Sequence, residues 1–281
     1  MKKLLLRALL SVLLSVCSVS AQDWARQKLE KSSRHGEWVA IKHDGRSVDT
    51  FVVYPESKAK TPVVLVIHEI FGMSDWVEDL ADQVAEAGYI AVAPDLLSGA
   101  GPNGGGTKSL PSNAVGPAIG KLPPDQITAD LNAAADYGLR LPASNGKLFV
   151  AGFCYGGSQT FRFATNRPDL KAAFVFYGTA PSSGQQGQFV PDAAALARIK
   201  APVFGFYAGN DARVDASIAA TQEAMKAAGK TYEPVTYEGA GHGFMREGED
   251  PASTNPMHAA NVKARDEAWT RMKELLAKYS K

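Results

Sequence analysis

The most reactive side chain in this sequence is the thiol of Cys154, which lies in the segment Gly152-Phe153-Cys154-Tyr155-Gly156-Gly157. An apolar run precedes this segment and a helical pattern follows it. This context is typical of a nucleophile elbow, a tight strand-to-helix turn whose flanking glycines allow close packing. The N–H groups that open the following helix would favour a thiolate and a developing oxyanion. A buried structural cysteine in a glycine-rich turn is the alternative interpretation.

A thiol nucleophile needs a base, and the base needs a group that orients it. Asp211 follows the expected strand 202–207, and His242 follows the expected strand 232–237 in a loop flanked by glycines. Both residues therefore lie at the carboxyl ends of strands, where open α/β sheets bind their ligands. The order nucleophile, acid, histidine is the order of elbow hydrolases. We predict a catalytic triad of Cys154, Asp211 and His242.

Other polar residues compete for roles in the same site. Asp215 could replace Asp211, but it stands at the expected start of a helix, where N-capping explains it. His68 ends a buried strand and could be a satisfied core residue or could line the substrate site. Glu69 could be an ordinary exposed carboxylate, or a partly solvated one that needs a charged or thiol partner. The N–H that follows it, on Ile70, could form an oxyanion hole together with that of Tyr155.

The elements that position these residues alternate along the chain. The expected strands are 38–41, 48–54, 62–67, 89–93, 147–153, 172–177, 202–207 and 232–237, and the expected helices are 74–88, 125–138, 157–164, 215–228 and 258–279. This alternation predicts a mostly parallel sheet with helices on both faces. The turn at 43–46 predicts a hairpin, and hence antiparallel pairing at one edge. A weak segment spans 191–199, and 22–36 should form a short helix or an arm.

Residues 98–124 are rich in glycine, proline, serine and asparagine. We expect them to form a long loop inside the domain, one that is either functional or mobile. A loop of this kind could act as a lid over the site.

The N-terminus has the pattern of a secretory signal peptide. A basic start is followed by an apolar stretch at 8–19 and by the small residues Val19-Ser20-Ala21, and the stretch is too short for a membrane span. Cleavage after residue 21 would leave a single domain at 22–281, exported to a periplasm or secreted, without stable membrane association. An uncleaved anchor and lipidation at Cys17 are the alternatives. Without Cys17, Cys154 is an unpaired thiol, a liability in an oxidising compartment unless it is buried or used.

Composition narrows the class of partner. The 281 residues are 45% hydrophobic and 21% charged, which is ordinary for a globular protein. A net charge of +1 gives no indication of nucleic acid or an anionic membrane as a partner. The histidines lack the spacing of zinc ligands, so no metal or other cofactor is expected. The expected partner is a small-molecule ester or lactone.

From about Ser47 to its end, the chain resembles the dienelactone hydrolase family. The matching segments are His68-Glu69-Ile70-Phe71-Gly72, Ala93-Pro94-Asp95-Leu96, the elbow at 152–157, Gly209-Asn210-Asp211 and Gly241-His242-Gly243-Phe244. The resemblance implies an α/β-hydrolase fold and a hydrolase of the carboxymethylenebutenolidase type. It also implies that a Cys-His-Asp triad opens an enol lactone through a thioester acyl-enzyme.

The resemblance further implies roles for single residues. Glu69 would contact the resting thiol and help to deprotonate it, and the N–H groups of Ile70 and Tyr155 would form the oxyanion hole. Arg246, four residues after the histidine, would bind a substrate carboxylate. Gly99 stands where the family has a second arginine, and the chain carries an export signal, so dienelactone itself is the less expected substrate.

Three other functions remain open on the sequence. The same residues could serve a broad carboxylesterase or thioesterase, because loops such as 98–124 build the substrate pocket. A non-catalytic ligand-binding protein could use this fold, since fold does not dictate function. A redox role for Cys154 is the weakest of the three, because the mature chain would have no second cysteine to resolve a disulfide.

Overall fold

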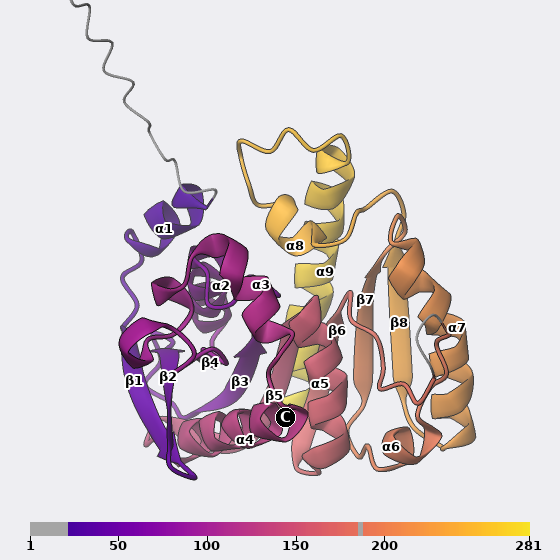
Figure 1. The fold of residues 1–281 in the computed structure, drawn as a ribbon, viewed down its shortest axis with the longest axis horizontal. Helices are drawn as coiled ribbons and strands as arrows, with labels where there is room; N and C mark the ends of the chain where they lie inside the picture. The colour runs from indigo at the N-terminus through magenta and orange to yellow at the C-terminus, as the bar shows by residue number, and fades with distance from the viewer. Residues whose placement is uncertain (1–21, 185–187) are drawn as a thin grey trace, which may run out of the picture.

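The computed structural model describes residues 22–184 and 188–281, so the predicted signal peptide lies outside the described residues. An eight-stranded sheet with the order β1-β2-β4-β3-β5-β6-β7-β8 forms its centre (Figure 1). The strands are β1 (Gly36–His43), β2 (Arg46–Val53), β3 (Thr61–Ile67), β4 (Ile90–Pro94), β5 (Ser144–Phe153), β6 (Leu170–Phe176), β7 (Val203–Ala208) and β8 (Tyr232–Tyr237). β1 pairs antiparallel with β2, and β2 with β4, while all other neighbours are parallel. The predicted sheet, including its antiparallel edge, is confirmed.

Helices cover both faces of the sheet. They are α1 (Asp23–Leu29), α2 (Asp75–Glu86), α3 (Ser112–Ile119), α4 (Pro124–Arg140), α5 (Tyr155–Asn166), α6 (Ala193–Ala197), α7 (Ala212–Ala227), α8 (Phe244–Glu247) and α9 (His258–Tyr279). One core cluster joins α2 and α9 to one face, and a second joins α4, α5 and α7 to the other. Every residue of β3 is buried, which explains its unbroken apolar run, since a central parallel strand is covered on both sides.

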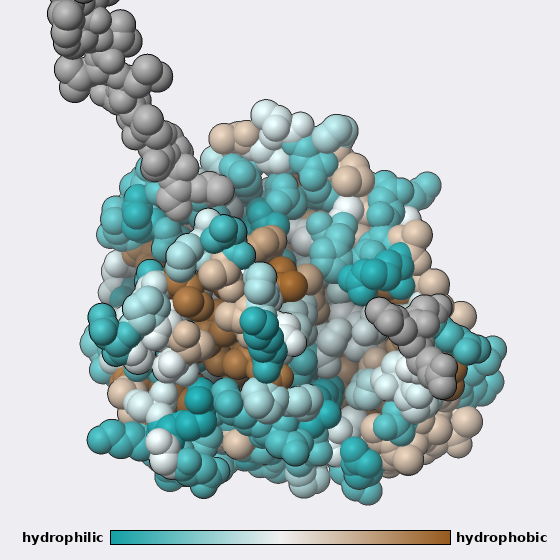
Figure 2. All heavy atoms as spheres, viewed as in Figure 1, coloured by the Kyte–Doolittle hydropathy of each residue, from teal (hydrophilic) through white to brown (hydrophobic). Residues whose placement is uncertain are grey.

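The expectation of a long loop at 98–124 is wrong in part. Two short 3-10 turns, Pro102–Gly104 and Thr107–Ser109, lead into helix α3. The composition conceals this helix because Gly116 and Pro117 are poor helix formers. Tertiary packing stabilises it instead, since Val115 and Ile119 form a small core cluster with Leu97. Hydrophobic side chains gather in a hollow around α2 and α3 on this face of the molecule (Figure 2).

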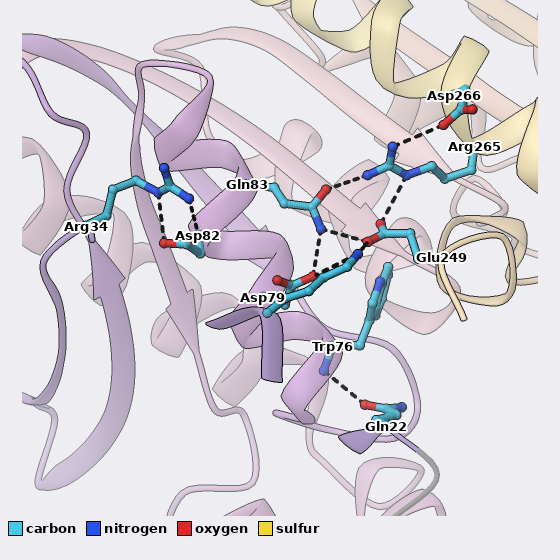
Figure 3. Close-up of polar contacts among 10 residues, drawn as sticks. Gln22, Arg34, Trp76, Asp79, Asp82, Gln83, Glu249, Arg265 and Asp266 are labelled. Carbon is cyan, nitrogen blue, oxygen red and sulfur yellow. Dashed lines mark hydrogen bonds and ion pairs between the residues drawn. The ribbon is translucent and has the colours of Figure 1, made fainter. Parts of the chain in front are cut away.

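A polar network connects α1, α2 and α9 (Figure 3). Glu249, in the segment after α8, accepts hydrogen bonds from Lys28 Nζ at 3.0 Å and from Gln83 Nε2 at 2.8 Å. Arg265 of α9 donates to Glu249 at 3.2 Å and to Gln83 Oε1 at 2.6 Å. These contacts tie the N-terminal helix to the last helix through α2. Within the described part of the chain, no helix combines the length and hydropathy needed to span a bilayer.

Candidate active site

Cys154 lies at the turn between β5 and α5 with a strained backbone, φ 55° and ψ −114°. A positive φ is unusual for a residue that carries a Cβ, and it persists here because the surrounding packing enforces it. A Cβ on Gly152 would lie 2.1 Å from the carbonyl oxygen of Gly156. A Cβ on Gly156 would lie 2.2 Å from the carbonyl oxygen of Ile67, at the end of β3. Both glycines are required because backbone packs directly on backbone at this turn.

The thiol, imidazole and carboxylate of the expected triad form one chain of contacts. Cys154 Sγ lies 3.0 Å from Nε2 of His242. Nδ1 of His242 lies 2.5 Å from Oδ2 of Asp211, and donates to it. Asp211 also caps helix α7 by accepting from the Val214 N–H at 3.3 Å, so the carboxylate is held on both sides. The arrangement matches a nucleophile, a base and the group that orients the base.

Helix α7 begins earlier than the sequence pattern predicts. It starts at Ala212, so the N-cap is Asp211, and Asp215 lies within the first turn. The capping role expected for Asp215 therefore belongs to Asp211. Burial and then the negative charge of Asp211 raise the pKa of Asp215, and the imidazole of His242 bonds to Asp211.

The histidine is electrostatically prepared to hold a proton. Burial alone would lower the pKa of His242, but its hydrogen bonds with Cys154 and Asp211 outweigh burial and raise the pKa to about 9. An imidazolium therefore persists at neutral pH, stabilised by the carboxylate of Asp211.

The two backbone donors expected for an oxyanion hole flank the elbow. Tyr155 is the first residue of α5, and Ile70 lies in the loop after β3. The carbonyl groups of Ile67 and His68, just before this loop, pack closely against Gly156. In residues 22–184 and 188–281, neither the Ile70 nor the Tyr155 N–H donates to a backbone carbonyl. Free N–H groups at a helix start and in an adjacent loop can stabilise negative charge.

Glu69 has a charged partner and does not make the contact with the thiol that the family resemblance implies. The carboxylate is 2% exposed, and its Oε2 accepts from Nε of Arg246 at 2.9 Å. The thiol of Cys154 bonds to His242 instead. Burial raises the pKa of Glu69, and the charge of Arg246 opposes this rise. Glu69 pairs with Arg246 because a buried carboxylate is stabilised far better by a guanidinium than by a thiol.

Arg246 lies on α8 beside Glu69, close to the elbow. Its Nη1 donates to Glu247 at 2.6 Å, and its guanidinium lies over the ring of Phe71, 5.1 Å from the ring centre. The side chain retains 21% exposure. Arg246 is thus partly accessible at the edge of the site, while most of its charge is balanced by the two acids.

His68, expected to contact substrate, is fully buried. Its Nδ1 donates to the carbonyl oxygen of Glu69 at 2.7 Å, and its Nε2 accepts from the Leu96 N–H at 3.2 Å. Burial lowers the pKa of His68, consistent with a neutral ring that donates on one side and accepts on the other. Because backbone groups occupy both nitrogens, this ring joins the loops after β3 and β4 and does not face a substrate.

Tyr177 is a site residue that the sequence reasoning missed. It is 1% exposed, and its φ of 40° is unusual for an aromatic residue. Its hydroxyl donates to Glu69 Oε1 at 3.4 Å, and its ring packs edge-on against His242 with ring centres 5.0 Å apart. One signal could have revealed it, since it follows β6, the neighbour of β5, at the carboxyl edge of the sheet.

A strained cysteine elbow on this sheet, followed in chain order by an aspartate and a histidine after later strands, defines an α/β-hydrolase. A model of the dienelactone hydrolase family matches residues 48–280. The chain is 32% identical to a Salmonella typhi protein named as a carboxymethylenebutenolidase, over 85% of this chain and 86% of that protein. A relative of the same name from Methylorubrum extorquens is also 32% identical, over 83% of this chain and 77% of that protein.

A solved structure agrees with these relatives. A protein from Klebsiella pneumoniae described as a dienelactone hydrolase superposes with a TM-score of 0.73 and 27% identity, over 88% of this chain and all of that one. This chain belongs to the dienelactone hydrolase family and is a hydrolase of ester bonds. In the described residues, no group of three or more His, Cys, Asp or Glu side chains is arranged to hold a metal ion.

Proposed function

We propose that this chain hydrolyses an ester or lactone with Cys154 as nucleophile and a thioester acyl-enzyme as intermediate. The observation that carries the proposal is the continuous contact from Sγ to Nε2 at 3.0 Å and from Nδ1 to Asp211 at 2.5 Å. The thiolate attacks the carbonyl carbon, and the N–H groups of Ile70 and Tyr155 hold the oxyanion.

His242 then moves the proton in both halves of the reaction. The imidazolium gives its proton to the leaving alkoxide or enolate as the thioester forms. The neutral imidazole next takes a proton from water, which attacks the thioester and releases the acid. A pKa of about 9 for His242 supports its role as the proton donor in the first half. Because a thiolate is itself a good leaving group, substrates with good leaving groups, such as enol and aryl esters, should react fastest, and amides slowly.

Arg246 is the proposed anchor for a carboxylate on the substrate. Its partly exposed guanidinium lies at the edge of the site, held by Glu69 and Glu247. The name carboxymethylenebutenolidase describes relatives that act on a lactone bearing a carboxylate. In this chain Arg246 would act without a second arginine, because Gly99 occupies that position.

The test compares the chain 22–281 with its Cys154→Ala variant on three substrates: an activated aryl ester, an enol lactone with a carboxylate, and a thioester. We expect turnover that the variant loses, and an acyl-enzyme of the mass of the chain plus the acyl group in rapid-quench mass spectrometry. A Cys154→Ala variant with full activity would refute the cysteine mechanism. No turnover by the wild type on any member of the panel would favour a binding protein on this fold.

We also propose that residues 1–21 direct export and are removed. The expected result is an exported mature protein whose N-terminal residue is Gln22, determined by N-terminal sequencing of the exported fraction. Retention of Met1 in that fraction would indicate an uncleaved anchor, and an acylated N-terminus at Cys17 would indicate a lipoprotein.

A further inference from the structure

A cavity of about 580 Å³ lies beside the loop that follows β3. One wall comes from α1 and a second from the start of α2, and the segment between β4 and α4 forms the third. Apolar side chains line much of it, namely Phe71, Met73, Leu110 and Val115. This cavity, called the side cavity below, is not formed by any triad residue, and it coincides with the region where Figure 2 shows hydrophobic surface around α2 and α3.

The side cavity begins next to the proposed oxyanion hole. Phe71 lines it, and Ile70, the residue that supplies an oxyanion N–H, precedes Phe71 in the chain. These two adjacent side chains are 51% and 38% exposed, which is unusual for large apolar residues. A Cβ on Gly116 of α3 would lie 3.7 Å from Ile70, so α3 packs along the same loop. Because Ile70 and Phe71 are consecutive, a substrate carbonyl held at the Ile70 N–H would lie one residue away from the lining of the side cavity.

The charges at the side cavity do not favour an anionic ligand. Its two basic residues are Arg26 and Lys108. Arg26 pairs with Asp23 at 2.6 Å, and Lys108 pairs with the buried carboxylate of Glu78. Asp75 adds a negative charge to the lining. Arg246, whose guanidinium lies over the Phe71 ring, is paired with Glu69 and Glu247. Since these cations are already balanced, an uncharged apolar group is the ligand that gains most from this site.

The side cavity is held in shape by buried hydrogen bonds. Thr107 Oγ1 accepts from the Met73 N–H at 3.1 Å and donates to Asp95 Oδ1 at 2.7 Å. The Thr107 N–H donates to Asp95 Oδ2 at 2.7 Å. On the other side, Gln22 caps α2 by accepting from the Trp76 N–H at 3.0 Å (Figure 3). The walls are therefore preformed relative to Cys154, which lowers the entropic cost of binding a ligand.

We propose that the side cavity is a substrate subsite that takes a long, uncharged apolar group attached to the scissile ester, such as a medium-length acyl chain. This inference rests on the proposed hydrolysis by Cys154, and it adds a long apolar acyl group to the substrates that the site can take.

The test uses aryl esters of acetic, butanoic, hexanoic and octanoic acid. In the wild type, kcat/KM should rise roughly threefold per added methylene until the cavity is filled. Leu110→Trp, which narrows the cavity, should reduce this rise and leave acetyl ester turnover within about twofold. Gln222→Trp is the matched control, because Gln222 lines a separate surface cavity of about 380 Å³ on α7. This variant should change neither the rise with chain length nor the turnover of the acetyl ester. A flat chain-length profile in the wild type, or equal losses on all four esters in Leu110→Trp, would overturn the subsite.

A binding measurement separates this inference from the proposed chemistry. Isothermal titration calorimetry measures the binding of a methyl alkyl ketone, an analogue that cannot be hydrolysed. The proteins compared are Cys154→Ala and the double variant that carries Cys154→Ala and Leu110→Trp. We expect binding to Cys154→Ala that weakens at least about tenfold in the double variant. Equal affinities would reject the subsite even if Cys154-dependent hydrolysis is observed. Binding of the expected pattern would retain the subsite even if no ester is turned over.

Discussion

At the scale of single residues, the site depends on charges that are stabilised in pairs. Cys154 Sγ lies within hydrogen-bonding distance of His242 Nε2, and Asp211 holds the imidazole from the other side. Behind them, Glu69 and Arg246 form a second pair that is more deeply buried. Each pair satisfies charges that would be costly alone in a dry environment. The first pair is placed for chemistry, and the second holds the loop after β3 against α8.

The pH dependence of the reaction tests the first pair. Since the pKa of His242 is about 9, the imidazolium that protonates the leaving group is present at neutral pH and disappears as the pH rises through this value. We expect kcat/KM for an alkyl ester, whose leaving alkoxide needs this proton, to fall above about pH 9. Asp211→Asn, which removes one hydrogen bond that raises this pKa, should move the fall to lower pH. A profile that is flat to pH 10.5 would contradict the assignment of His242.

Removal of one partner tests the second pair. Arg246→Met leaves the Glu69 carboxylate buried and unpaired, so we expect a loss of about 2–4 kcal/mol in the free energy of unfolding at pH 8. The loss should shrink toward pH 5, because Glu69, whose pKa burial already raises, then takes up a proton. Arg26→Met is the control, since Arg26 is 52% exposed and its ion pair should contribute less than about 0.5 kcal/mol. Denaturant titrations at both pH values measure these changes.

At the scale of elements, contacts between backbones decide where the site forms. The start of α5 packs on the end of β3 with no room for a side chain, which places the elbow beside the loop of Ile70. The turns before α3 are attached to the same loop, because Thr107 bonds both to Met73 and to Asp95. The nucleophile, the expected oxyanion donors and the wall of the side cavity are thereby held in fixed relation.

A single methyl group at the elbow tests this packing. In Gly156→Ala, the new Cβ would lie 2.2 Å from the Ile67 carbonyl oxygen, so β3 and α5 must separate. We expect a loss of about 3 kcal/mol in stability and a loss of turnover larger than the unfolded fraction explains. Gly120→Ala makes the same change where the nearest atom would lie at 3.6 Å, and it should be neutral. Equal melting temperatures for the two variants would contradict the close approach.

A missing hydroxyl tests the attachment of the turns before α3. In Thr107→Val the Met73 N–H loses its partner, and Asp95 Oδ1 keeps only the Leu97 N–H, at 3.0 Å. We expect a loss of about 1–3 kcal/mol in stability, because the Met73 N–H is buried. Turnover of the octanoyl ester should fall more than turnover of the acetyl ester, because the cavity wall loosens while the triad does not. Kinetics on the same ester series, with denaturant titration, check both effects.

At the scale of the whole molecule, the network of Figure 3 joins segments that are far apart in the sequence. Asp79 and Glu249 are both 3% exposed in their side chains, and they share Gln83 and Lys28 as partners. Burial, followed by the charge of Glu249, raises the pKa of Asp79 to about 6. Because these two neighbouring carboxylates are buried, the stability of the junction between α1, α2 and α9 depends on pH.

The stability of that junction should change with pH in a defined direction. The folded state holds a proton on Asp79 up to about pH 6, whereas an ordinary aspartate loses it near 3.8, so ionised Asp79 reduces stability above pH 6. We expect Asp79→Asn to raise the free energy of unfolding by about 1–2 kcal/mol at pH 8, with a gain that vanishes toward pH 4. Asp82→Asn should have the opposite effect at pH 8, because it breaks the paired contact with Arg34. Denaturant titrations of both variants between pH 4 and pH 8 measure these changes in the free energy of unfolding.

The sequence alone determined the order and type of most elements and the three residues of the expected triad. The unbroken apolar run of β3 and the glycines around Cys154 are local signals, and the carboxyl ends of parallel strands must converge, so Asp211 and His242 could be placed beside the elbow. The tertiary structure decided what depends on partners distant in the chain. It paired Glu69 with Arg246, directed both nitrogens of His68 to the backbone, and brought Tyr177 against His242. Helix α3 belongs to the same group, because its stability comes from packing on Leu97 and not from its own residues.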